Sequence, residues 1–106
     1  MAKYLVKSSY TAEGTKGLLK EGGTGRKAIV EEMVKRLDGR LEAFYYALGD
    51  ADVYAIVDVP DVTSAVAVSM IVNASGAVTL STTPLLTPEE IDKACKRSID
   101  YRPPGR

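Results

Sequence analysis

Five polar side chains in this sequence are candidates for binding a small ligand: Tyr10, Arg26, Lys27, Asp52 and Asn73. Arginine offers a forked donor to an anion, and a nearby aspartate can accept a hydrogen bond or act as a base. The hypothesis is that Arg26 and Asp52 flank a small polar or carboxylate-bearing ligand. The alternative is that Asp52 caps its own turn and Arg26 pairs with it structurally, and this alternative is favoured because ion pairs are often merely structural.

The sequence contains no histidine and a single cysteine, Cys95. It therefore lacks the commonest metal ligand, the usual general base near neutral pH and the Ser-His and Cys-His pairs of nucleophilic catalysis. No acidic cluster has the spacing of a calcium loop. We expect no metal and no cofactor, and an enzyme built on this chain has to rely on carboxylates, Tyr, Lys or Arg.

A glycine-rich segment, Gly23-Thr24-Gly25-Arg26-Lys27-Ala28, matches the G-x-G-x-x-A pattern of dinucleotide-binding loops. In those proteins the pattern directly follows a strand and opens its crossover helix, whereas here it follows a helical turn. A phosphate or carboxylate can still bind where free N–H groups and two cations meet. A flexible hinge is favoured over an anion site, because glycine clusters are usually loops.

Composition limits the partners that we expect. Lys and Arg number 14 and Asp and Glu also number 14, so the formal net charge is zero and no basic field attracts nucleic acid or an anionic membrane. No apolar run reaches the roughly 18 residues of a transmembrane helix, and the first residues read as a strand rather than a signal peptide. We expect a cytoplasmic protein with one domain over residues 1–100 and a tail over 101–106.

Hydrophobic spacing predicts two long helices. The first runs from Arg26 to Leu37, after a short helical turn over 12–19 and a glycine break over 21–25. Gly39 is expected to end it as a left-handed cap. The second runs from Val62 to about Ala74 with Asp61 as its cap, and it is apolar nearly all round, which predicts cover on more than one side.

Alternating residues predict four strands, over 3–10, 41–48, 53–59 and 77–83, with a hairpin turn at Gly49–Asp52 between the middle two. Thr87-Pro88-Glu89-Glu90 is a capping box that opens a last helix. Cys95 lies on the apolar side of that helix, so we expect it to serve packing rather than catalysis.

The order of these elements predicts a ferredoxin-like α+β fold, βαββαβ with an additional C-terminal helix. Right-handed crossovers give a four-stranded antiparallel sheet in the order 4-1-3-2, with both long helices on one face. This topology brings the end of the first strand, the glycine break, the hairpin turn and the region of Asn73 to one end of the sheet. That end is the expected rim of a pocket.

The sheet face away from the helices is expected to bind a partner. The small residues of the hairpin suit packing against the helices. The set with larger side chains should therefore face outward and form a mainly apolar patch. Its members are Phe44, Tyr46, Tyr54, Ile56 and Asp58. Two such faces can close by isologous contact into a dimeric α+β barrel. Lys7 and Asp58 are expected to meet on this face, and stacking on nucleic acid is disfavoured by the zero net charge.

Around the hairpin the sequence resembles the GYD domain family, whose name comes from a Gly, Tyr, Asp signature at this turn. The resemblance covers most of the chain, and Ala51 departs from it because it stands where the family has the signature Tyr. The matching segments are Tyr4-Leu5-Val6 to Tyr10-Thr11, Arg26, Leu37 to Leu41, Phe44-Tyr45, Leu48-Gly49-Asp50 with Asp52, Pro60-Asp61 and Thr82-Thr83 to Glu90. The resemblance implies a ferredoxin-like, oligomeric protein and brings no assigned activity with it.

The resulting hypothesis is a homo-oligomeric small-molecule-binding or assembly module of the GYD type. The alternative is a small metal-free, cofactor-free enzyme of the dimeric α+β barrel oxygenase or isomerase kind. That enzyme would use Asp52 with Arg26 and one of Tyr10, Tyr46 or Tyr54.

Overall fold

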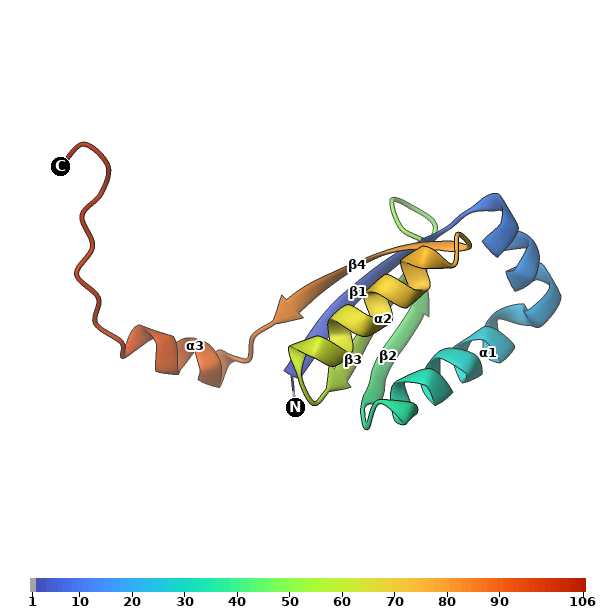
Figure 1. Cartoon of the computed structure of the whole chain (residues 1–106), viewed down its shortest axis with the longest axis horizontal. Helices are drawn as coiled ribbons and strands as arrows, with labels where there is room; N and C mark the ends of the chain where they lie inside the picture. The colour runs from blue at the N-terminus through green and yellow to red at the C-terminus, as the bar shows by residue number, and fades with distance from the viewer. Residues whose placement is uncertain (1) are drawn as a thin grey trace.

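The computed structural model describes residues 2–106, which form seven elements in the order β-α-β-β-α-β-α (Figure 1). Their bounds are β1 Ala2–Tyr10, α1 Ala12–Arg36, β2 Arg40–Tyr46, β3 Val53–Val59, α2 Val62–Ala74, β4 Val78–Leu85 and α3 Pro88–Cys95. The order is the predicted one. The fold is α+β and ferredoxin-like, with a C-terminal helix added.

The four strands form one antiparallel sheet in the order β2-β3-β1-β4, which is the predicted order. Both long helices lie on the same face, with α1 against β2 and α2 against β4 (Figure 1). The most deeply buried side chains include Val34 of α1 and Val59 of β3. Among residues 2–106, no helix covers the other face of the sheet.

Helix α1 changes direction at Gly22, which confirms the predicted break. Gly22 has φ 76° and ψ 163°, a conformation outside the helix region that glycine adopts at little cost. The first part of α1 starts at the cap Thr11, whose hydroxyl accepts a hydrogen bond from the Gly14 N–H. The second part runs back across the sheet, and Arg26 lies just after the bend.

The cap at the end of α1 differs from the prediction. Asp38, not Gly39, has the positive φ, at 57°. Gly39 is needed for close approach instead, because a Cβ there would lie 2.6 Å from the backbone oxygen of Asp58 and 3.0 Å from a methyl group of Val34. The glycine lets the chain approach the end of β3 closely where β2 begins.

The predicted faces of β2 are wrong. Phe44 pairs with Ala55 and Tyr46 with Val53, so both aromatic residues lie on the helix side of the sheet. A four-residue connection, closed by the Ala47 N–H donating to the Asp52 carbonyl at 2.8 Å, pairs even-numbered residues of β2 with odd-numbered ones of β3. The expected faces would require a connection with an odd number of residues. A shift of one residue in the pairing moves every side chain of the strand to the opposite face.

Helix α2 spans the predicted residues and begins at the predicted cap, where Asp61 Oδ1 accepts from the Ser64 N–H at 2.8 Å. Cover on more than one side is not found within this chain. Ala65 packs against the sheet, whereas the outward side chains of α2 are exposed. These are Val62, Val66, Met70 and Ile71.

Helix α3 begins at the predicted capping box, in which Thr87 and Glu90 exchange two hydrogen bonds. It stands away from the body, and the chain continues outward to its end (Figure 1). The radius of gyration is 17.1 Å, above the roughly 13 Å of a compact domain of this size, because of this arm. Cys95 is exposed, so the packing role expected for it is not found within the chain.

Candidate functional site: a cavity between the sheet and the helices

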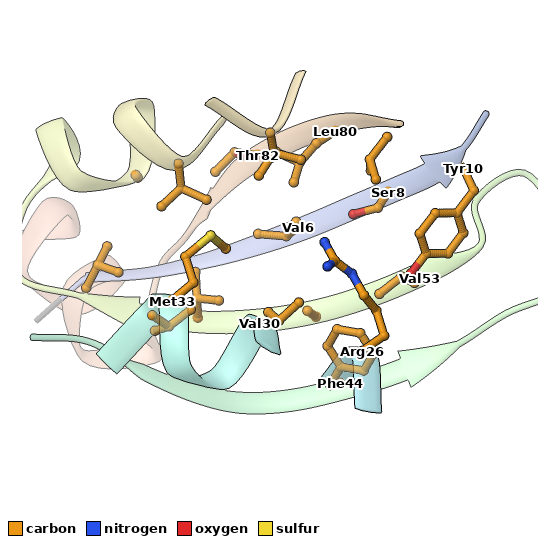
Figure 2. Close-up of a pocket in the computed structure, with 18 residues that line it drawn as sticks. Val6, Ser8, Tyr10, Arg26, Val30, Met33, Phe44, Val53, Leu80 and Thr82 are labelled. Atoms are coloured by element: carbon orange, nitrogen blue, oxygen red, sulfur yellow. The ribbon is translucent and has the colours of Figure 1, made fainter. Parts of the chain in front are cut away.

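A cavity of about 70 Å³ lies between the helix side of the sheet and helices α1 and α2 (Figure 2). Its wall is almost entirely apolar and is built from alternate residues of each strand and from the inward sides of both helices. The lining residues are Val6, Ser8, Tyr10, Arg26, Val30, Met33, Val34, Phe44, Val53, Ala55, Val57, Val59, Ala65, Val68, Val72, Val78, Leu80 and Thr82.

Three polar side chains gather at one end of this cavity: Ser8, Tyr10 and Arg26 (Figure 2). Ser8 and Tyr10 are two positions apart on β1, so the strand's alternation points both to the helix side. The bend of α1 at Gly22 brings Arg26 over the same end. Strand β1 and the second part of helix α1 together supply the cluster of polar side chains at this end of the cavity.

Arg26 has no acidic partner in the part of the chain that the structure describes. The ion pairs among residues 2–106 link Lys3 to Glu42 and Asp58, Arg36 to Glu32, and Arg40 to Asp58. None of them includes Arg26. The side chain is half-buried and enters the cavity. A cation that is partly removed from water without a counter-charge is costly, so this end of the cavity favours a negatively charged group.

The phenol of Tyr10 lies close enough to the side chains of Arg26 and Tyr46 for both to influence its pKa. Burial raises the pKa of Tyr10 above its ordinary value of 10.0, and Tyr46 adds to the rise while Arg26 opposes it. Tyr10 therefore stays protonated near neutral pH and can donate a hydrogen bond.

Asp52 does not pair with Arg26, in contrast to the structural alternative inferred from the sequence. Its carboxylate accepts a hydrogen bond from the Tyr10 N–H (2.8 Å), and its own N–H donates to the Ser8 carbonyl (2.8 Å). These two bonds fasten the hairpin connection to the end of β1. Asp52 lies next to the polar end of the cavity and fixes the backbone of β1 there, but it does not line the cavity.

The other two candidates lie elsewhere. Lys27 is exposed and does not line the cavity. Asn73 spans from α2 to β4, since its amide nitrogen donates to the Leu80 carbonyl (3.1 Å) and its oxygen accepts from the Leu80 N–H (2.7 Å). Asn73 also borders a separate surface groove beside α2. The structure thus brings Tyr10 and Arg26 together and leaves Lys27 and Asn73 apart from them.

Sequence reasoning did not identify Ser8 or the aromatic ring of Phe44 as part of this site. Ser8 could have been predicted, because strand alternation places it on the same face as Tyr10, two positions away. In the structure only 8 % of its surface is exposed. Phe44 was not, because its side of the sheet depends on the register of the hairpin.

The uncovered sheet face carries Tyr54, Ile56 and Asp58 as predicted, while Phe44 and Tyr46 lie on the opposite side. Tyr45, which pairs with Tyr54, takes their place and is 72 % exposed.

Asp58 on this face is a buried carboxylate within a cluster of charges. It pairs with Lys3 (3.0 Å) and Arg40 (3.6 Å), not with Lys7. Lys7 instead lies over the ring of Tyr54, 5.9 Å from its centre. A hydrogen bond from Lys3 and the positive charges of Lys3 and Arg40 lower the pKa of Asp58 below 3.8, against the opposing effect of burial.

Within residues 2–106, no three His, Cys, Asp or Glu side chains are grouped so that they could hold a metal ion. Among the same residues, no helix has the length and apolar character needed to cross a membrane.

Comparison with known proteins gives one match. The model of the GYD domain family matches residues 4–95, which is most of the chain. No curated protein and no solved structure shows significant similarity to this chain. The chain therefore belongs to the GYD domain family, and the matched segment runs from β1 to the end of α3.

Proposed function

We propose that this GYD-domain protein is a homo-oligomeric module that binds a small organic anion in the cavity between its sheet and its helices. The observation that carries the proposal is the guanidinium of Arg26, which enters a largely apolar cavity and has no acidic partner among residues 2–106. An anion bound there would supply the missing charge, and the surrounding apolar wall would strengthen the attraction by excluding water.

Binding receives more support than catalysis. The cavity wall contains no carboxylate and no histidine, and the carboxylate of Asp52, beside its polar end, is engaged by the Tyr10 N–H. The raised pKa of Tyr10 moves it further from neutrality, where a general base is most effective. The oxygenase or isomerase alternative required Asp52 as an available base beside Arg26.

A thermal-shift screen against organic carboxylates, sulfonates and phosphates tests the binding proposal. A ligand present at 100 times its dissociation constant adds about 2.7 kcal/mol to the free energy of unfolding, which is readily measured. We expect at least one anion to stabilise the wild type and Lys27→Met, and to leave Arg26→Met unshifted. Lys27→Met is the matched control, because it removes an adjacent cation outside the cavity. Equal stabilisation of Arg26→Met, or no response to any anion, would overturn the proposal.

Assembly with a second copy is supported by apolar surface that one chain leaves uncovered. Tyr45, Tyr54 and Ile56 lie on the open face of the sheet, and the outward side of α2 and the arm that contains α3 are also exposed. Two sheets packed through their open faces would remove the first of these surfaces from water. The lone exposed Cys95 suits a reducing compartment, and we propose a cytoplasmic location on that ground.

Sedimentation velocity at micromolar concentration tests this assembly. The expected species is a dimer or larger, and Ile56→Lys should convert it to monomer by placing a charge in the interface. Leu48→Lys is the control, because Leu48 is fully exposed in the hairpin connection. A wild-type monomer contradicts the proposal, and an Ile56→Lys protein that remains a dimer shows that another surface is used.

A further inference from the structure

We infer that the anion is a monocarboxylate with a compact hydrocarbon body, bound with its carboxylate at Arg26 and its body in the apolar part of the cavity. This inference rests on the proposed function and names the chemical class of its ligand. Three properties of the cavity carry it: the number of its cations, the arrangement of its donors and the absence of free donors elsewhere in its wall.

The charge of the cavity favours a single negative charge. Arg26 is the one cationic side chain in the wall formed by the described residues. Lys27, the next residue, is exposed outside the cavity. The cations nearest in the sheet, Lys3 and Lys7, belong to the opposite face. A phosphate monoester carries about two charges at neutral pH and would leave one of them uncompensated in an apolar cavity.

The donors at the polar end suit the two oxygens of a carboxylate. The guanidinium of Arg26 presents paired N–H groups, which match a carboxylate in a bidentate geometry. The protonated phenol of Tyr10 and the hydroxyl of Ser8 lie at the same end of the cavity, where they can donate to the remaining lone pairs (Figure 2). One head group can thus engage all three side chains.

The rest of the wall has no free hydrogen-bond donor for a second polar group, because the Thr82 proton is used by Ser69, which donates its own proton to the Ala65 carbonyl. Beyond the polar end, Thr82 carries the one remaining side-chain hydroxyl of the lining, and it is hydrogen-bonded to Ser69 at 2.7 Å. A second carboxylate on the ligand would lose its hydration without a donor to replace it, and a ligand hydroxyl would find one acceptor, the Thr82 oxygen, in exchange for its full hydration. The cavity of about 70 Å³ holds roughly five water-sized groups, which corresponds to a short branched chain.

Isothermal titration with four probes that share a branched hydrocarbon body tests the inference: isovalerate, isovaleramide, 3-hydroxy-3-methylbutyrate and isobutyl phosphate. We expect isovalerate to bind most tightly and each of the other three to bind more than about tenfold more weakly. In Arg26→Met the binding of isovalerate should fall by more than about tenfold, and in Tyr10→Phe by a few-fold. Lys27→Met should bind like the wild type.

A filled cavity gives an independent check. Val30 is only half-buried in the wall, so Val30→Phe should occupy the apolar part with little harm to folding, and it should abolish isovalerate binding while Arg26 is intact. Circular dichroism melting confirms that each variant is folded. Tighter Arg26-dependent binding of isobutyl phosphate or the hydroxy acid would overturn the carboxylate class and leave anion binding standing. Binding of every probe without dependence on Arg26 would overturn both.

Discussion

Two groups of cationic side chains lie on opposite sides of the same sheet and differ in whether their charge is neutralised within the chain. On the open face, Lys3 and Arg40 both pair with Asp58, and Lys3 also pairs with Glu42. On the helix side, Arg26 enters an apolar cavity and has no acidic partner among residues 2–106. The charges of the cluster are balanced within the chain, whereas a partner for the Arg26 guanidinium would come from the proposed ligand.

The largest expected effect is a difference in sign between the two sides. Arg26→Met removes a partly desolvated charge and keeps an unbranched side chain, so the ligand-free protein should become more stable by about 1 kcal/mol. Lys3→Met should instead lower the free energy of unfolding, because it leaves the buried Asp58 with Arg40 alone. Urea denaturation of both variants at low ionic strength measures the two effects. A loss of stability in Arg26→Met would mean that Arg26 has a structural role.

The backbone support of the charged cluster gives an effect of similar size. Gly39→Ala places a methyl group 2.6 Å from the backbone oxygen of Asp58, so β2 and β3 must separate locally. We expect a loss of about 1 kcal/mol in the free energy of unfolding. Gly49→Ala is the matched control, because a Cβ there meets no atom within 4 Å. Equal denaturation midpoints for the two variants would show that the strands tolerate the added group.

Much of this architecture could be predicted from local patterns. The caps at Asp61 and Thr87, the break at Gly22 and the alternation of the strands each depend on neighbouring residues, and together they gave the correct element order. The sheet order then followed from the handedness of the crossovers. Arg26 and Tyr10 were correctly placed at the same end, because the topology alone fixes which strand and helix ends meet.

The remaining features depend on contacts between distant segments. The register of the hairpin is set by the connection that Asp52 fastens to Ser8, and an irregularity follows between Leu41 and Ala43. Those contacts decided the faces of Phe44 and Tyr46, which sequence alternation could not. The Tyr10 N–H likewise occupies the Asp52 carboxylate, so the expected pairing of Asp52 with Arg26 does not form.

Acid should weaken the ion pairs that Asp58 forms with Lys3 and Arg40 on the open face of the sheet. The pKa of Asp58 in the folded protein lies below its ordinary value of 3.8, so the unfolded chain takes up this proton first as the pH falls. The stabilisation is complete above pH 3.8 and is lost as the pH drops through the folded pKa. Asp58→Asn should therefore show a smaller fall in melting temperature between pH 5 and roughly pH 2 than the wild type.

A part of the acid sensitivity should remain in Asp58→Asn. The pKa values of Asp61 and Glu90 are also lowered, chiefly by hydrogen bonds from the backbone of Ser64 and Thr87. Identical pH profiles for the wild type and Asp58→Asn would show that the charged cluster contributes no measurable stability.

The smallest expected effect concerns the bend that brings Arg26 over the cavity. The hydroxyl of Tyr46 donates to the Gly23 carbonyl at 3.0 Å and so ties β2 to α1 next to the kink at Gly22. Tyr46→Phe removes this exposed bond and should cost about 0.5 kcal/mol or less in global stability. Amide hydrogen exchange should quicken over residues 12–25 and stay unchanged in β1 and β3. Faster exchange across the whole sheet would instead assign Tyr46 to the core, and unchanged exchange would show that the bend is held without it.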